Sequence, residues 1–266
     1  MAKTIMAIGG HIGDAELTAG ALMASNAVDG GQNITVALTA GERGNPPHLT
    51  PKEYRVQKVK EAETFASMVN GEAVVLEYCD GELPNDEKVR REVAELIIKY
   101  KPNVIITHWH SAMHKDHNAT HYIVQDAQFL ASVVGNAEGK RHYAPVYFAE
   151  NWEDDQDFQP YIYVDVTKGY DLWCKALHEH WFVMNSKDFK YYDYYTSLAR
   201  ARGALCKRQY AECFNILPHQ KKVLRRQANN TFSLLSFANT SIPLSPVHHP
   251  QILPSFPFCR PSKASR

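Results

Sequence analysis

Short runs rich in β-branched residues alternate with longer amphipathic stretches through the first 150 residues, and this alternation constrains the fold most. Strands that alternate with helices form βαβ units, in which the strands lie parallel. We therefore expect an α/β fold with one mostly parallel sheet and helices on both faces. The predicted strands are residues 4–8, 34–38, 73–76, 104–107, 145–148 and 161–166. The predicted helices are residues 15–28, 51–69, 86–100, 118–134, 170–184 and 194–211.

Charge divides the chain into two segments. The 266 residues hold 29 Lys+Arg and 29 Asp+Glu, but residues 217–266 contain seven bases and no acid. We therefore predict a single domain over residues 1–216 and a basic tail over residues 217–266. Because the tail is rich in Pro and Ser, we expect it to be poorly ordered. Two alternative interpretations of the tail are a docking arm for an anionic partner and an unnatural end produced by translation in another reading frame.

Composition excludes several classes of protein. A pI near 7.2 argues against a generally basic nucleic-acid binder. No run of about 18 apolar residues is present, so we expect no membrane span. The N-terminal apolar run is too short for a signal peptide. The five cysteines form no Cys-x-x-Cys pair, which argues against a disulfide framework or a thiolate zinc site. We expect a cytoplasmic protein.

Polar residues follow the first predicted strand, in the segment Gly-Gly-His-Ile-Gly-Asp-Ala-Glu at 9–16. Ligands of parallel sheets bind outside the carboxyl ends of the strands. The dinucleotide pattern Gly-x-Gly-x-x-Gly fails here because Ile8 stands where its first glycine belongs. His11 and Asp14, three residues apart in a turn, offer two ligand types that zinc accepts. Taken alone, His11 is better explained as an ordinary loop histidine, so a third ligand is needed.

A second cluster supplies that ligand. Five of the chain's 13 histidines fall in residues 108–121, directly after the predicted strand 104–107. His117 can complete the metal site, and His114 is then free to act on a substrate. Asp116 can accept a hydrogen bond from a neighbouring imidazole and fix its tautomer. A solvated, histidine-rich loop is the alternative.

The ordered set of motifs resembles the PIG-L/LmbE-like family of zinc-dependent de-N-acetylases. The family's His-Pro-Asp-Asp-x-Glu is similar to His-Ile-Gly-Asp-Ala-Glu at 11–16, and its His-Pro-Asp-His to His-Lys-Asp-His at 114–117. Between them, Leu-Thr-Ala-Gly-Glu-Arg-Gly at 38–44 resembles a third family motif. Tyr-Ala-Glu-Cys-Phe at 210–214 resembles the closing one. The resemblance spans residues 1–216 and implies a Rossmann-like, LmbE-like fold.

The resemblance also implies roles. His11, Asp14 and His117 match the metal ligands, with zinc expected and another divalent metal as the alternative. His114 matches the histidine that polarises the substrate carbonyl or donates a proton, with Asp116 behind it. Either Arg55 or Lys58 matches a substrate-binding base, and we assign Arg55. The implied substrate is a small N-acetylated sugar or glycoconjugate, and the family implies a homo-oligomer.

One departure bears on activity. The family's general-base aspartate is Gly13 in this chain, and loss of a base costs about 10²–10⁴-fold in rate. Glu16, His110 and Asp116 are candidates to replace it. The leading hypothesis is a metal-dependent deacetylase acting on the linear amide of an N-acetyl sugar. The alternatives are a metal-retaining pseudoenzyme that binds a sugar, and a metal-dependent hydrolase of another amide or ester.

Overall fold

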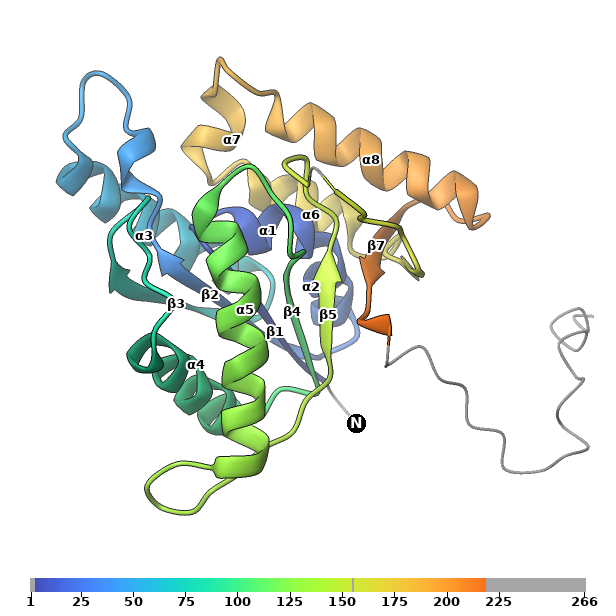
Figure 1. Cartoon of the computed structure of the whole chain (residues 1–266). Helices are drawn as coiled ribbons and strands as arrows, with labels where there is room; N and C mark the ends of the chain where they lie inside the picture. Colours follow the sequence, from blue (N-terminus) through green and yellow to red (C-terminus); the bar gives the residue numbers. More distant parts are fainter. Residues whose placement is uncertain (1–2, 155, 219–266) are drawn as a thin grey trace, which may run out of the picture. The chain divides into compact units, whose positions relative to one another are not determined.

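The predicted sheet forms the centre of the computed structural model, which describes residues 3–154 and 156–218. Its strands are β1 (Thr4–Gly9), β2 (Gln32–Thr39), β3 (Gly71–Tyr78), β4 (Val104–His108), β5 (Val146–Ala149), β6 (Ile162–Asp165) and β7 (Ala211–Asn215). In the described residues they lie in the order β3-β2-β1-β4-β5-β7-β6, as Figure 1 shows in part. The first five pair in parallel, while β7 is antiparallel to both β5 and β6.

Helices cover both faces of this sheet (Figure 1). Side chains alternate along a strand, so Ile5 and Ala7 of β1 join one apolar cluster while Met6 and Ile8 join the other. The helices are α1 (Asp14–Thr18), α2 (Gly20–Val28), α3 (Pro51–Met68), α4 (Glu87–Tyr100), α5 (Lys115–Phe129), α6 (Tyr170–Leu177), α7 (Trp181–Asn185) and α8 (Tyr191–Leu205). Helices α1, α2, α3, α6 and α8 pack on one face, and α4 and α5 pack on the other. The predicted α/β fold is confirmed.

Two short elements complete the description. The 3₁₀ turn Glu42–Gly44 follows β2, and the π-helical turn Leu130–Val134 continues α5. Among the described helices, none is both long and apolar enough to cross a membrane. The predicted tail lies almost entirely outside the described residues, which end at 218.

The expected helix over residues 194–211 is wrong at its end. Helix α8 ends at Leu205, and Ala211 begins the buried strand β7. The chain reverses through Lys207, whose φ is 62°, and Arg208 N donates to Gly203 O at 2.8 Å. Lysine gives no turn signal in a sequence, so a left-handed residue of this type is not visible in the pattern.

Two other helices are interrupted. The expected helix 15–28 breaks at Ala19 into α1 and α2, and the expected helix 170–184 breaks around His180 into α6 and α7. Glu212 of β7 explains the first break, because its carboxylate accepts hydrogen bonds from Ala21 N at 2.9 Å and Leu22 N at 2.8 Å. The closing motif at 210–214 therefore caps the start of α2.

Candidate metal centre

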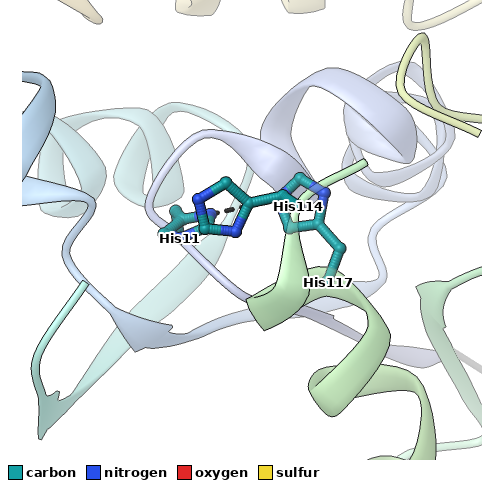
Figure 2. Close-up of side chains that lie close together, drawn as sticks. All are labelled: His11, His114 and His117. Atoms are coloured by element: carbon teal, nitrogen blue, oxygen red, sulfur yellow. Dashed lines mark hydrogen bonds between the residues drawn. The ribbon is translucent and has the colours of Figure 1, made fainter. Parts of the chain in front are cut away.

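Three ligand atoms converge at the carboxyl edge of the sheet, two of them visible in Figure 2. His11 follows β1, Asp14 begins α1, and His117 lies in the first turn of α5. His11 Nδ1 is 3.0 Å from His117 Nε2 and 3.3 Å from Asp14 Oδ2. Asp14 Oδ2 is 3.2 Å from His117 Nε2. The predicted metal ligands thus form a nearly equilateral triangle.

Carboxylates contact the outer nitrogens of both imidazoles. Glu153 Oε2 lies 2.8 Å from His117 Nδ1. Asp80 Oδ1 and Asp116 Oδ2 lie 3.2 Å and 3.4 Å from His11 Nε2. A carboxylate on one ring nitrogen holds the proton there and leaves the lone pair on the other. In the neutral rings that a metal ion requires, the lone pairs of His11 Nδ1 and His117 Nε2 would therefore face the triangle.

The site attracts positive charge. Burial disfavours the charged form of His11, but hydrogen bonds, the largest with Asp116 and then Asp14, outweigh burial and raise its pKa well above the usual value. Burial also opposes the charge on His117, yet attraction to Asp14 raises the pKa of His117 to about 9. Two buried imidazoles that hold protons so strongly mark a surplus of negative charge around them.

These residues fit a metal ion. Ligands about 2.0–2.1 Å from a tetrahedral zinc ion are roughly 3.3 Å apart, close to the three sides of the triangle. The set of two imidazoles and one carboxylate is one that zinc binds in catalytic sites, with a further position open. A divalent cation would also neutralise the surplus charge. Three overlapping groups of the described residues have a spacing suited to a metal ion, and each contains two or more residues of this site: His11, His114 and His117; His11, Asp80, His114 and Asp116; and Asp14, His108 and His117.

His114 lies beside His11 and His117 (Figure 2), with its ring centroid 4.5 Å from that of His11 and 5.1 Å from that of His117. It is the N-cap of α5, and its Nδ1 accepts a hydrogen bond from the backbone N–H of Asp116 at 3.2 Å. In the neutral ring the proton must then be on Nε2, which lies 4.0 Å from Asp80 Oδ1. Burial, and then the positive charges on His11 and His117, lower the pKa of His114. His114 is thus a neutral N–H donor at the site.

Asp116 and His114 interact differently from the expectation. The Asp116 carboxylate is fully buried, accepts a hydrogen bond from Gly81 N at 2.7 Å and faces His11. Its hydrogen bond to the His114 ring comes from its backbone. The cause is helix geometry, because the first residues of a helix donate their free N–H groups to the N-cap side chain.

Arg55 lies away from the site. Its guanidinium donates to Leu76 O at 2.9 Å and pairs with Glu77 at 2.9 Å, and Arg55 is not among the residues that line the pocket. Lys58, the alternative base, is nearly one turn further along α3 and does line the pocket. The assignment of Arg55 to substrate binding is therefore not supported by its position.

The structure explains why position 13 is a glycine, which the surrounding sequence does not reveal. Its φ is 111°, and a Cβ built on it would lie 2.2 Å from Phe182 Cζ. The Phe182 ring from α7 therefore fills the space in which an aspartate side chain at position 13 would begin. Gly13 N donates to Glu16 Oε2 at 2.9 Å, which caps α1.

None of the three candidate replacements for the missing base lines the pocket. Glu16 is buried at the α1 cap, where burial raises its pKa to about 7. His110 packs against the ring of Trp109 at 4.3 Å between centroids. Asp116 faces His11 from within the protein. The pocket does contain Asp80 and Glu153.

The triangle forms part of the wall of a pocket of about 740 Å³. Six aromatic side chains are among the residues that line it: Tyr54, Trp152, Trp181, Phe182, Tyr191 and Tyr195. A volume of this size is typical of sites for small molecules.

The sequence reasoning missed Asp80, Glu153, Tyr54 and Phe182. Asp80 follows β3 and Glu153 follows β5, so the rule about carboxyl ends of strands would have found both had it been applied to every strand. Tyr54 and Phe182 carry no such signal, since each lies in a helix and contributes through packing.

The fold and the site together define an α/β protein with a candidate three-ligand cation site at the carboxyl edge of its sheet. Residues 6–128 match the model of the PIG-L family, described as GlcNAc-PI de-N-acetylase. This match agrees with the resemblance to the PIG-L/LmbE-like family that the motifs indicated.

Relatives include enzymes of two kinds. The chain is 27% identical over 221 residues to 4-oxalmesaconate hydratase of Pseudomonas putida, with 77% of this chain and 82% of that protein covered. Solved structures of the same fold include two of these enzymes. One is the 4-carboxy-2-hydroxymuconate hydratase of Pseudomonas putida KT2440, at 22% identity and a TM-score of 0.74, over 85% of this chain and 100% of that one. The other is the N,N'-diacetylchitobiose deacetylase of Pyrococcus horikoshii, at 21% identity and a TM-score of 0.71, over 85% and 88%.

Proposed function

We propose that the protein is a metal-dependent hydrolase that cleaves the amide bond of a small N-acylated molecule, with an N-acetylated sugar as the first candidate substrate. The observation that carries this proposal is the triangle formed by His11 Nδ1, Asp14 Oδ2 and His117 Nε2 in the wall of a pocket. Deacetylases among the structures of the same fold support it.

His11, Asp14 and His117 would hold the ion, which we take to be zinc. When bound, such an ion lowers the pKa of a water molecule to about 7 and polarises a carbonyl oxygen. Glu153 would keep the His117 ring oriented through its contact with Nδ1. Asp80 and Asp116 would do the same for His11.

His114 would stabilise the developing negative charge, and Asp80 would transfer the proton. The N–H at His114 Nε2 would donate a hydrogen bond to the acyl oxygen as negative charge develops there. Asp80 Oδ1 lies 4.0 Å from the same nitrogen, and Asp80 lines the pocket. We therefore assign Asp80 the role of general base, which accepts a proton from the attacking water. The water oxygen bonds to the acyl carbon, the C–N bond breaks, and the amine leaves with the proton that Asp80 held.

Hydration of a carbon–carbon double bond is the second candidate. It is favoured by Gly13 and Phe182, which remove the family's base from its usual position, and by the 27% identity to a hydratase. In such a reaction water adds its oxygen to one carbon and a proton to the next. The metal triangle and the N–H of His114 would serve this reaction as well.

The test measures the zinc content of the protein and its catalytic turnover separately. The purified protein should contain about one zinc per chain, and His11→Ala and His117→Ala should lose it, whereas His178→Ala, at an exposed histidine, should keep it. Acetate release from N-acetyl sugars reports hydrolysis, and the loss of ultraviolet absorbance of conjugated unsaturated acids reports hydration. Full metal content without turnover in either panel would refute both reactions for those substrates and favour a metal-retaining binding protein.

Asp80→Asn tests the proton transfer. Because Asp80 also contacts the ligand His11, the assay is run at saturating zinc with the metal content measured; kcat should then fall about 10²–10⁴-fold, as expected for loss of a general base. An unchanged kcat would remove Asp80 from the mechanism.

A further inference from the structure

Two buried hydrogen-bond donors in the pocket have almost no partners. Tyr54 is 1% exposed and Lys58 is 5% exposed, and both line the pocket. They are four residues apart on α3, so they lie on the same face of that helix. Buried donors are normally hydrogen-bonded, and each exception in a structure calls for an explanation.

Within the described residues, Tyr54 Oη has no hydrogen-bond partner. Lys58 Nζ makes one weak hydrogen bond there, to Gly41 O at 3.5 Å. An ammonium group has three N–H donors, so most of this capacity is unused. In the same part of the chain, no carboxylate lies within 4.0 Å of Lys58 Nζ. Burial lowers the pKa of Lys58, and the negative charges of Asp14 and Asp80 oppose that shift from further away.

Aromatic rings hold the ammonium group in place. Lys58 Nζ lies 4.7 Å from the centroid of Phe182 and 5.6 Å from that of Tyr54. Both distances are in the range of cation–π attraction. The rings keep Lys58 in the pocket without supplying an acceptor for its N–H groups.

Two glycines make room for this arrangement. A Cβ at Gly41 would lie 2.8 Å from Lys58 Nζ, and a Cβ at Gly13 would lie 2.2 Å from Phe182 Cζ. The absence of the family's aspartate is thus what allows the Phe182 ring to pack over Gly13 and against Lys58. The family resemblance predicts an aspartate, and so a negative charge, at position 13. This chain instead has the Phe182 ring in that space, with the Lys58 ammonium group on its face.

We infer that Tyr54 and Lys58 bind a carboxylate group of the substrate, so that the substrate carries a carboxylate in addition to the group that reacts. A carboxylate only accepts hydrogen bonds, and it would satisfy both donors while pairing with the buried ammonium. One cation and one hydroxyl match a singly charged carboxylate better than a phosphate, which carries more charge and more acceptors. This inference rests on the proposed function in taking the pocket as the substrate site.

Binding of simple dicarboxylates tests the inference. The probes are malonate, succinate, glutarate and adipate, each compared with its neutral diamide, titrated calorimetrically into the zinc-loaded full chain. We expect at least one acid of the series to bind, and Lys58→Met to weaken that binding about 10- to 100-fold, as for loss of a charge-assisted hydrogen bond. Tyr54→Phe, which preserves shape, should weaken it about two- to tenfold. Lys60→Met, at an exposed lysine of the same helix, is the matched control and should have no effect.

The inference is overturned if no acid of the series binds better than its diamide, or if Lys58→Met and Lys60→Met bind the acids equally. Circular dichroism of each variant checks folding, and Tyr54→Phe decides the matter if Lys58→Met does not fold. Failure of the proposed function looks different. In that case dicarboxylate binding still depends on Lys58 while neither panel of substrates is turned over. Conversely, turnover of neutral N-acetyl sugars that is unaffected by Lys58→Met supports the hydrolase and refutes the acidic substrate.

Discussion

Restoring an aspartate at position 13 should destabilise the protein. Gly13 has a φ of 111°, where a residue with a Cβ is strained, and the new Cβ would lie 2.2 Å from Phe182 Cζ. Backbone strain of this kind costs about 1–3 kcal/mol, and overpacking costs about 1–3 kcal/mol. Since the two costs relax together in part, we expect Gly13→Asp to lower the free energy of unfolding by about 2–4 kcal/mol.

Urea denaturation and thermal melting measure this loss. For a domain of this size, 1 kcal/mol corresponds to about 2–4 °C, so the Tm should fall by roughly 4–16 °C. Gly30→Asp is the matched control, because Gly30 has a φ of 80° but no atom within 4 Å of its added Cβ. It should show the strain alone, at about 1 kcal/mol.

The double variant Gly13→Asp/Phe182→Ala separates the clash from the strain. Removing the ring makes room for the aspartate, so the double variant should be about 1–3 kcal/mol more stable than the sum of the two single effects predicts. If Gly13→Asp is as stable as Gly30→Asp, or if the two single effects simply add, the packing of Phe182 against Gly13 is not what excludes the aspartate. The same double variant, assayed for acetate release, shows whether the missing base alone limits hydrolysis.

Two further predictions concern carboxylates that support the site and the fold. Glu153→Gln should weaken zinc binding about 10- to 100-fold, measured by competition with a chelator, because it weakens the contact that orients His117; unchanged affinity would contradict that role. Glu212→Ala should lower the free energy of unfolding by about 2–4 kcal/mol in urea, because it leaves Ala21 N and Leu22 N buried without acceptors. A loss below about 0.5 kcal/mol would show that water replaces the carboxylate there.

Much of the fold could be predicted from the sequence. The alternation of β-branched and amphipathic runs placed the parallel strands, since both faces of a buried strand require apolar side chains. What it could not place was β7, a five-residue run that follows α8 without a glycine or proline between them. The reversal there passes through Lys207 in the left-handed conformation, and β7 then pairs between β5 and β6, far from it in sequence.

The residues of the candidate site could likewise be predicted only in part. His11, Asp14 and His117 could be predicted because they follow strand ends that parallel pairing brings to one edge of the sheet. The partners of their outer nitrogens could not, since Asp80 and Glu153 approach from other strands and nothing local pairs them with an imidazole. Arg55 was assigned from the resemblance, with Lys58 as the alternative, and it is Lys58 that lines the pocket.

The sequence by itself determined the order of strands and helices and the residue types at the strand ends, because hydrophobic period and ligand chemistry are local properties. Only the tertiary structure decided what stands in for the missing aspartate. Phe182 lies 169 residues from Gly13 along the chain, yet its ring fills the space above that glycine and carries Lys58 on its face. These contacts depend on how three separate segments of the chain pack together. The residue spacing within any one segment therefore does not predict them.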